Sequence, residues 1–407
     1  MAIAEVPEYA HLSDADVAAL GAELDTIRDD IERSRGTKDM EYIHRAILIQ
    51  RGLEIASRLT ILASKAKLGW IAGTVGLAVA KCIENMELAH NITHGQWDWM
   101  NDPEIHSATW EWDMVGPSAH WMSSHNHRHH VYTNVVDVDH DLGFGVMRVT
   151  RDQDWRPSNL FQPLRAVLLA ILFEWGVAMH GLYSVQERED TEAAKAAHHK
   201  TMVRKMIRQS VKDYLLFPAL SLRKFRRTFG ATLVANGLRN AWAYIVIVCG
   251  HFADGADKFS ASVLEDETKP EWYLRQMLGT ANFRSGRLLS FMSGHLSYQI
   301  EHHLFPDLPS NRLPEISERV RALCATYDLP YTTGSFLRQY LLTVRTICKL
   351  ALPVHYLTDS CDDAPETCSE NKFRVGTKRP ESIVSADGRR SGLATAALAH
   401  RERRKAS

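Results

Sequence analysis

The chain has 407 residues, and its 48 Lys and Arg nearly balance its 49 Asp and Glu. This balance gives no reason to expect bulk binding to nucleic acid, and the length is sufficient for one large domain or two ordinary ones. The mean hydropathy of −0.25 fits a soluble protein, or one with a few membrane segments among large polar portions. The six cysteines are scattered without a CxxC pair, which argues against a disulfide framework and a zinc site and favours a reducing, cytosol-facing environment.

The N-terminal stretch, residues 1–40, is charged and has helical tendency, so we expect a peripheral cap. It lacks a basic start followed by an apolar core and does not read as a secretory signal. The next notable segment, Leu68–Ala80, is uninterrupted apolar sequence but short for a membrane span. A continuation towards Leu88 reaches spanning length if Lys81 and Glu84 find partners.

A pair of histidines, His90 and His94, lies where this first apolar segment would leave the membrane. The spacing of four residues places both imidazoles on one face of a helix, close enough for one metal centre. Taken alone, such a pair is more often two surface histidines.

A second cluster contains four histidines within six positions: His125, His127, His129 and His130. On an α-helix, His125 and His129 share a face and His130 lies about a quarter-turn round, so one helix can present ligands to two metal ions. His127 competes with His125 as the first ligand, and the helical phase favours His125. A basic nucleic-acid patch and a chance metal-adhesive tract are the plain alternatives.

Two further apolar segments are better candidates for membrane spans. Leu164–Val185 contains Glu174 and His180, which would be costly in lipid unless they face protein. Thr228–Phe252 contains Arg239, whose charge would be costly in lipid. The apolar segments together predict three or four weak spans, with a soluble lobe made from the rest.

The segment between these two spans, residues 187–227, is rich in Lys and Arg and includes the short apolar patch Tyr214–Leu222. The positive-inside rule would place it in the cytoplasm. A simple hairpin of the two spans would instead place it outside, if the histidine clusters are all cytoplasmic. A re-entrant Tyr214–Leu222 is one way to reconcile the two, and the conflict stays open.

The last histidine cluster lies in residues 253–353, which are expected to be soluble helices and loops. Adjacent His302 and His303 are followed by an apolar turn that contains prolines, which would fix the end of their helix. His251, at the end of the third apolar segment, is positioned to contribute from the membrane side. His295, slightly upstream of the cluster, is a further candidate.

Three histidine clusters, each next to a predicted membrane boundary, together predict a metal site. Imidazole suits iron, zinc and copper, and seven or more histidines imply at least two ions. Neutral ligands leave high positive charge on the metals, which suits an oxidising iron–oxygen centre able to break an unactivated C–H bond. Nearby carboxylates are expected to accept the other N–H group of the ligating histidines. These are Glu87, Asp98, Asp137, Asp139 and Glu301.

The motifs, in this order, resemble those of the membrane fatty-acid desaturase family. The chain has HNITH at 90–94, HNHRHHVYTN at 125–134 and QIEHHLFPDLP at 299–309. Beyond the boxes, ENMELAHNITHGQWDWMNDPEIHSATWEWDMVG and EWYLRQMLGTANF resemble bacterial acyl-CoA Δ9-desaturases that use a separate NADPH-dependent reductase. The similarity covers roughly residues 40 to 355, and the three boxes are highly specific.

The resemblance implies an all-α fold, a membrane-embedded helical bundle of about four spans with a cytosolic helical cap that carries a di-iron site. With the composition, it implies an N-terminal cap segment at 1–40, a desaturase domain at 41–355 and a disordered polar tail at 356–407. Gln299 stands where many relatives have histidine, and its amide is expected to bond a metal-bound water rather than the metal. The implied metal ligands are His90, His94, His125, His129, His130, His302 and His303, with His251 as an eighth.

The implied reaction uses two Fe ions and O₂ to remove two hydrogens from a saturated long-chain acyl-CoA, leaving a cis double bond, expected at Δ9, and water. The HPGG haem signature of fused cytochrome-b5 type domains is absent, so electrons are expected from NADPH through a partner oxidoreductase. The implied partners are acyl-CoA, this reductase and membrane lipid, without nucleic acid. The implied location is an integral multi-pass membrane protein whose active site faces the cytoplasm.

Some residues keep two interpretations. The tryptophans between the first two boxes either line an acyl tunnel or anchor the cap at the membrane surface. Asn134 is a helix cap or a turn residue. The basic loop 187–227 meets a coenzyme A phosphate, an acidic electron donor or, as the plainest choice, anionic lipid headgroups. The tryptophans in question are Trp97, Trp99, Trp110, Trp112 and Trp121.

Two alternative functions stay open from sequence. A lipid hydroxylase, ketolase or acetylenase on the same scaffold would differ only by small geometric changes. A histidine-rich membrane protein for metal transport or buffering belongs to another class. Transporters would place histidines inside the spans, whereas these histidines lie at the ends of the spans.

Overall fold

The computed structural model describes residues 11–150, 152–253 and 255–353, so the predicted tail 356–407 lies outside the described residues. The described chain is helical apart from loops, an isolated bridge and one small parallel sheet of β1 (Asn282–Arg284) and β2 (Thr333–Ser335). In that sheet Phe283 lies opposite Gly334. The expected all-α class is therefore confirmed.

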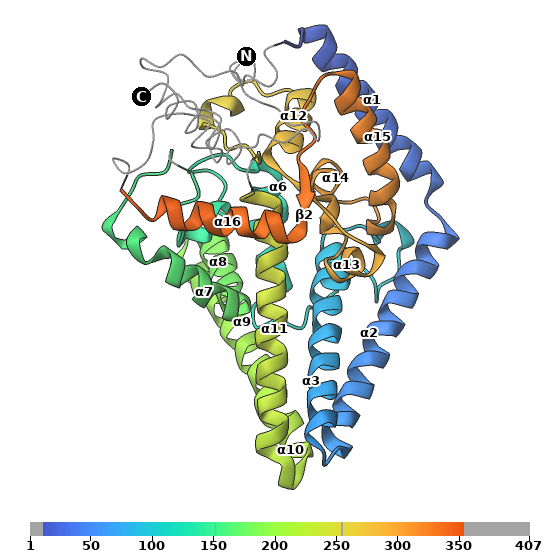
Figure 1. Ribbon diagram of the computed structural model, residues 1–407, viewed down its shortest axis with the longest axis vertical. Coiled ribbons are helices and arrows are strands. Elements are labelled where there is room, and N and C mark those ends of the chain that lie inside the picture. The colour runs from blue at the N-terminus through green and yellow to red at the C-terminus, as the bar shows by residue number, and fades with distance from the viewer. Residues whose placement is uncertain (1–10, 151, 254, 354–407) are drawn as a thin grey trace, which may run out of the picture.

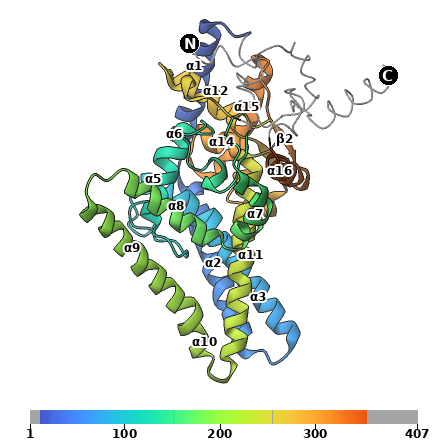
Figure 2. The ribbon, with the colours of Figure 1, turned by 90° about the vertical axis from the view of Figure 1, so that its left-hand side faces the viewer.

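Long helices form a tapering bundle beneath a broader cap (Figure 1). α3 (Lys67–Cys82) packs against both α2 (Thr37–Ala63) and α11 (Phe225–His251). α9 (Glu192–Val211) descends along another side to the narrow end of the bundle, where the chain turns towards α11 (Figure 2). That turn consists of η7 (Lys212–Leu216), α10 (Phe217–Leu220) and η8 (Leu222–Lys224).

One helix in the described part, Leu222–His251, is long and apolar enough to cross a membrane. A second candidate exists only if the bent pair Pro157–Ile171 and Phe173–Glu187 counts as one span. The four predicted spans are not confirmed by this criterion. Of the other segments expected to contribute, Leu68–Ala80 lies in α3, which has 16 residues, and Tyr214–Leu222 lies in the short elements η7, α10 and η8.

The predicted span Leu164–Val185 is not straight. Its two halves are α7 (Gln162–Ile171), which continues η6 (Pro157–Phe161), and α8 (Phe173–Glu187), and the bend between them is 99°. The bend places Glu174, near the start of α8, inside the protein. A straight helix in lipid would have left this carboxylate without a partner.

Charged residues that the sequence places inside apolar segments have buried partners. Lys81 Nζ lies 2.6 Å from an oxygen of Asp113 and 3.1 Å from one of Asp213. Arg239 Nη2 lies 2.9 Å from Glu174 Oε2, and both side chains are almost fully buried. The expectation that these charges face protein is confirmed.

The cap encloses its own apolar core. α1 (Asp14–Ser34) packs against α12 (Lys269–Gly279) and α15 (Leu313–Thr326), and the apolar faces of these helices meet α14 (Gln299–Leu304). The expected N-terminal cap segment is thus a helix whose start is fixed by a capping box between Ser13 and Asp16. The domain boundaries themselves stay a prediction.

Shorter elements connect the cap to the bundle. α16 (Phe336–Leu350) lies across the bundle and packs on α11 and α7 (Figure 1). The elements between α3 and α7 are η2 (Ile83–His90), α4 (Asn91–Thr93), η3 (Asp98–Met100), α5 (Ser118–Ser124), η4 (His125–His129), α6 (His130–Tyr132) and η5 (Leu142–Gly145). The remaining short elements after α11 are η9 (Ala261–Leu264), α13 (Arg287–Met292), η10 (Leu296–Tyr298) and η11 (Ser310–Arg312).

Candidate metal centre

The first two histidine motifs lie on π-helical turns. η2 ends at His90, and η4 runs from His125 to His129. The backbone N–H of His130 donates to the carbonyl of His125, five residues earlier, so the turn is wider than an α-helical one. The wider turn brings His125, His129 and His130 to one side, instead of leaving His130 a quarter-turn away as an α-helix would. This geometry accounts for an HxxxHH motif.

The predicted histidines form two compact groups beneath the cap. In each group, one ligand atom from every residue lies within 4.8 Å of the others. The first group consists of His90, His94, His125 and His302, and the second consists of His129, His251 and His303. All seven side chains are buried, and they come from segments up to 213 positions apart between 90 and 303.

His130 lies between the two groups. Its ring stacks on His303 with centroids 4.1 Å apart and meets His94 edge-on at 4.5 Å. Its Nε2 lies 3.2 Å from His125 Nε2. All eight predicted ligands are therefore brought together, whereas His127 is exposed on the outer side of the same turn. Their role as ligands stays a prediction.

Several imidazole nitrogens of these groups are buried without a hydrogen-bond partner among the described residues, including His94 Nε2, His302 Nε2 and His303 Nε2. An unpartnered buried nitrogen is costly unless a metal or another group binds it. The pKa values of His302 and His303 lie well below their ordinary value. Burial is the largest cause, and the neighbouring imidazoles are the next. Neutral imidazole is the form that ligates a metal, so the donor set fits ions that prefer nitrogen.

Of the five carboxylates expected to support ligands, Asp139 does so. Its oxygens lie 2.9 and 3.1 Å from His129 Nδ1, which directs His129 Nε2 towards His251. Burial lowers the pKa of His129, but the charge and hydrogen bond of Asp139 outweigh it and raise that pKa. The other four carboxylates were wrongly expected to act in this way. Glu87 bonds His295 and Tyr42, Asp98 bonds Ser107, Glu301 bonds Asn282 and Tyr331, and Asp137 is exposed.

Asp141 is a supporting residue that sequence reasoning missed. One oxygen lies 2.9 Å from His125 Nδ1 and the other lies 2.7 Å from His180 Nε2 on α8. Burial opposes ionisation, but the hydrogen bonds from His125 and His180 hold the pKa of Asp141 well below its ordinary value. Aspartates at every second position after the second motif, Asp137, Asp139 and Asp141, are the sequence pattern that could have identified it.

Replacing Asp139 with Asn is expected to lower metal affinity by about 10- to 100-fold, because the amide N–H can donate to His129 Nδ1 and so stabilise the wrong tautomer. Asp137→Asn removes the same charge from an exposed position two residues away and is the matched control. Bound metal per chain would be measured for both. Equal losses in the two variants would contradict a supporting role for Asp139.

Gln299 and His295 lie beside the candidate centre and have different hydrogen-bond partners. Gln299 Nε2 lies 2.9 Å from His251 Nε2, and its Oε1 is buried without a hydrogen-bond partner among the described residues. His295 is held by Glu87 through its Nδ1 at 2.9 Å and belongs to neither histidine group. Gly294 precedes it with φ +66, and a Cβ there would overlap the Met86 carbonyl, so glycine lets this loop reach η2.

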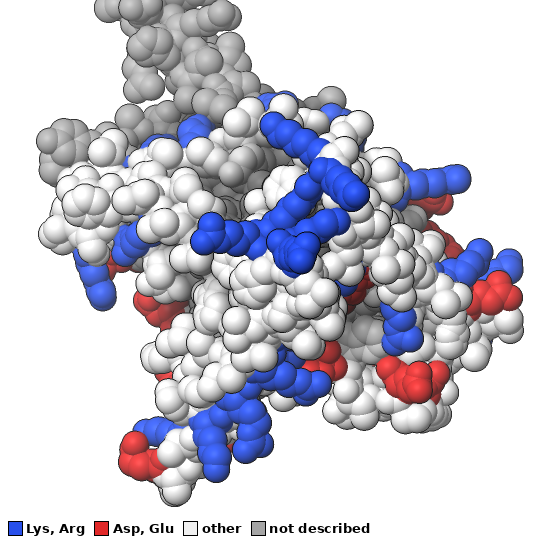
Figure 3. Space-filling view, turned by 90° about the horizontal axis from the view of Figure 1, so that it is seen from below, with Lys and Arg blue, Asp and Glu red and all other residues white. Residues whose placement is uncertain are grey.

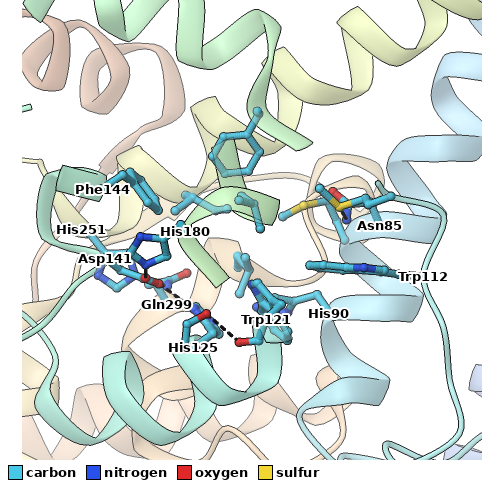
Figure 4. A pocket seen from close by; sticks show the side chains of 17 residues that line it. Asn85, His90, Trp112, Trp121, His125, Asp141, Phe144, His180, His251 and Gln299 are labelled. Carbon is cyan, nitrogen blue, oxygen red and sulfur yellow. Dashed lines mark hydrogen bonds and ion pairs between the residues drawn. The ribbon is translucent and has the colours of Figure 1, made fainter. Parts of the chain in front are cut away.

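A narrow pocket with a free volume of about 40 Å³ opens beside the first group. Figure 4 shows His125, Asp141 and His180 on one side of it and Trp112 with Asn85 at the opposite end. A larger cavity of about 710 Å³ adjoins the pocket, and four residues line both. These shared residues are Phe144, Phe173, Val177 and His180. A mostly apolar slot that ends beside an imidazole cluster suits an alkyl chain.

Three of the five tryptophans can be assigned, two to the tunnel interpretation and one to neither earlier interpretation. Trp112 and Trp121 line the pocket, which supports the tunnel interpretation for these two. Trp97 is fully buried and stacks on Tyr42, so it is a core residue. Asn134 has φ 58 and donates to backbone carbonyls, which makes it a turn residue.

Comparison with known proteins points to one family. The family model for fatty acid desaturases matches residues 68–335. A protein of Mycobacterium tuberculosis named "NADPH-dependent stearoyl-CoA 9-desaturase" is 54% identical over 412 aligned positions, covering 100% of this chain and 96% of the relative. A "Delta(5) fatty acid desaturase A" of Dictyostelium discoideum is 25% identical over 278 positions, covering 62% of this chain and 57% of the relative. A "Delta(8)-fatty-acid desaturase" of Helianthus annuus is 34% identical over 126 positions, covering 31% and 27%.

The fold and the site define a helical protein with a buried, imidazole-lined candidate metal centre beside an apolar pocket. The chain belongs to the fatty acid desaturase family, as the three histidine motifs predicted. It is an oxidoreductase of lipid metabolism. The family does not favour the hydroxylase or the metal-handling alternative.

Proposed function

We propose that the chain is an O₂-dependent acyl-CoA desaturase that places a cis double bond, at Δ9, in a saturated long-chain acyl group. The observation that carries the proposal is the pair of buried histidine groups against an apolar pocket. The relative named for stearoyl-CoA and NADPH, 54% identical over the whole chain, supports the substrate and the electron source.

Two Fe ions are the proposed metals, one for each histidine group. His90, His94, His125 and His302 would hold the first, His129, His251 and His303 the second, and His130 lies within reach of both. When bound, the irons supply the activation of O₂ that removal of hydrogen from a saturated carbon requires.

The side chains contribute positioning and exclusion of water. Asp139 and Asp141 each accept a hydrogen bond from Nδ1 of a ligand, which leaves Nε2 free to face the centre. The apolar walls orient the alkyl chain, and Trp112 and Met114 close the pocket beyond the first group. The position of the double bond then follows from which methylene the pocket holds beside the metals.

The proposed location is a multi-pass membrane protein with its active site facing the cytoplasm, where NADPH supplies electrons through a separate oxidoreductase. Exposed apolar side chains on α7 and α16 support contact with lipid beneath the cap. These include Leu164, Val167, Leu168 and Ile171 on α7, and Leu337, Leu341 and Val344 on α16. The proposed desaturase domain is 41–355, with membrane lipid and acyl-CoA as its partners.

Expression in a host that lacks its own desaturase tests the function. The fatty acids of that host, supplied with a working reductase, should gain a cis-Δ9 monoene. A hydroxylated chain without an alkene would identify a hydroxylase instead. Saturated lipids only, despite iron-loaded protein and active reductase, would contradict the proposal.

Replacing Trp112 with Ala is expected to raise turnover of longer acyl chains relative to shorter ones. Trp112 is 4% exposed and lines the inner pocket, so its removal lengthens the slot. The shift should reach about tenfold, the scale on which hydrophobic pockets discriminate one methylene. Competition between acyl-CoA substrates of two lengths measures it. Trp99→Ala, which lies outside the pocket, is the control, and an equal shift there would contradict the assignment.

A further inference from the structure

The narrow end of the bundle has an unbalanced charge. Two segments meet there, residues 60–70 and 215–230, and neither contains Asp or Glu. Figure 3, seen from this end, shows Lys and Arg side chains gathered on the surface. We call the six cations of these segments the basic apex: Lys65, Lys67, Arg223, Lys224, Arg226 and Arg227.

Two of the six cations have a structural task. Lys224 Nζ donates to the carbonyls of Leu62 and Ala63, the last turn of α2. Arg227 donates to the carbonyls of Lys65 and Ala66 at 3.0 and 2.6 Å. Together they satisfy the free carbonyls at the C-terminus of α2 and the turn after it, where a helix favours positive charge.

The other four cations have no such task. Lys65, Lys67, Arg223 and Arg226 are exposed, and in the described part of the chain their side chains take part in no ion pair or hydrogen bond. Elsewhere in the basic segment 187–227 the pattern differs. Lys205 lies 2.9 Å from Glu111, and Lys212 pairs with Asp113. Arg204 and Arg208 on α9 are exposed like the four apex cations, so the apex shares its uncompensated charge with one face of that helix.

An apolar collar of exposed side chains borders the basic apex, in the turn itself and on the adjoining ends of α3 and α11. Its side chains are exposed although they are large and hydrophobic, as expected for a surface that contacts lipid tails. They are Leu68 and Ile71 on α3, Leu215, Leu216, Leu220 and Leu222 in the turn, and Phe225 and Phe229 on α11. Cations that lie next to exposed apolar side chains at the end of a bundle fit the boundary between lipid tails and headgroups.

We propose that the basic apex binds the phosphate groups of anionic phospholipids in the leaflet opposite the histidine centre. The inference rests on the proposed membrane location. The complementarity is between four exposed cations without acidic neighbours and a negatively charged headgroup layer. The positive-inside rule alone would place this basic turn in the cytoplasm. Contact with anionic headgroups explains why the turn lies on the side opposite the histidine centre.

The test uses the full chain in vesicles of phosphatidylcholine with or without phosphatidylglycerol. Electron paramagnetic resonance of spin-labelled lipids reports which headgroup is enriched at the protein surface. The apex variant K65Q/K67Q/R223Q/R226Q keeps Lys224 and Arg227, so the turn stays capped. The control R33Q/K38Q/R321Q/K269Q removes the same charge from exposed positions of the cap.

Wild type and the cap control should enrich phosphatidylglycerol, and the apex variant should lose about fivefold in relative affinity for each cation removed. High salt should reduce the enrichment in wild type. Equal enrichment in wild type and apex variant would overturn the proposal, as would displacement of the lipid by inorganic phosphate at constant ionic strength, which would indicate a free-phosphate site. Failure of the wild type to float with any vesicle would instead refute the membrane location. Loss of product formation by the wild type would contradict the proposed enzyme function and not the lipid contact.

Discussion

Replacing His125 with Ala is expected to abolish desaturation, whereas replacing His127 with Ala leaves activity unchanged. His125 is buried and is a member of the first histidine group, and its Nδ1 lies 2.9 Å from Asp141 Oδ2. His127, two residues away, is exposed on the outside of the same π turn. Loss of a supporting partner alone costs about 10- to 100-fold, so loss of a ligand should exceed that range.

The two variants differ in position but not in chemistry, which makes His127→Ala a close control for expression and folding. Iron per chain and the yield of unsaturated product would be measured side by side. We expect His125→Ala to lose iron as well as activity. Normal iron content and activity in His125→Ala, or a matching loss in His127→Ala, would contradict the assignment of the second motif.

The sequence was sufficient to predict which histidines lie together, because clustered histidines are typical metal ligands. Three clusters in one order identified the family and seven of the eight histidines that the fold brings together, and the eighth, His251, was proposed from its place at the end of the third apolar segment. Their relative orientation was less predictable. An α-helical period assigns His130 a quarter-turn away, and only the π turn closed by the His130 N–H brings it into line.

The supporting residues were harder to predict than the histidines. Glu87, close to the first motif, bonds His295 and Tyr42 instead of a ligand. Asp141 reaches His125 because the chain reverses after Asn134, whose φ is 58. A carboxylate that is close to a histidine motif in the sequence need not contact a histidine. The hydrogen bond depends on the turn that folds the chain back.

The bundle shows a similar division. Hydropathy located the apolar stretches, and the need for partners for Lys81, Glu174 and Arg239 was correctly expected from the cost of charge in lipid. The bend of 99° between α7 and α8 was not predictable from hydropathy, because both arms are apolar. The bend accompanies a tertiary ion pair between Glu174 on α8 and Arg239 on α11, a contact that a window average cannot represent.

That ion pair is the basis of the largest expected effect on stability. Replacing Arg239 with Met is expected to reduce the free energy of unfolding by about 3–5 kcal/mol, because it leaves a buried carboxylate without its cation. Arg239 Nη2 lies 2.9 Å from Glu174 Oε2, with 1% and 3% of the two side chains exposed. The guanidinium also donates to Asn240 Oδ1 and to the Asp113 carbonyl, so three contacts are lost together.

Unfolding in a mild detergent measures the loss, and two further variants assign its cause. Arg226→Met removes an exposed arginine from the same helix and should change the free energy by no more than about 0.5 kcal/mol. The double variant R239M/E174Q should recover part of the stability that R239M loses, because neither side chain is then charged. If the double variant is as unstable as R239M, the unpaired carboxylate is not the source of the loss. The lost hydrogen bonds to Asn240 and Asp113 would then account for it.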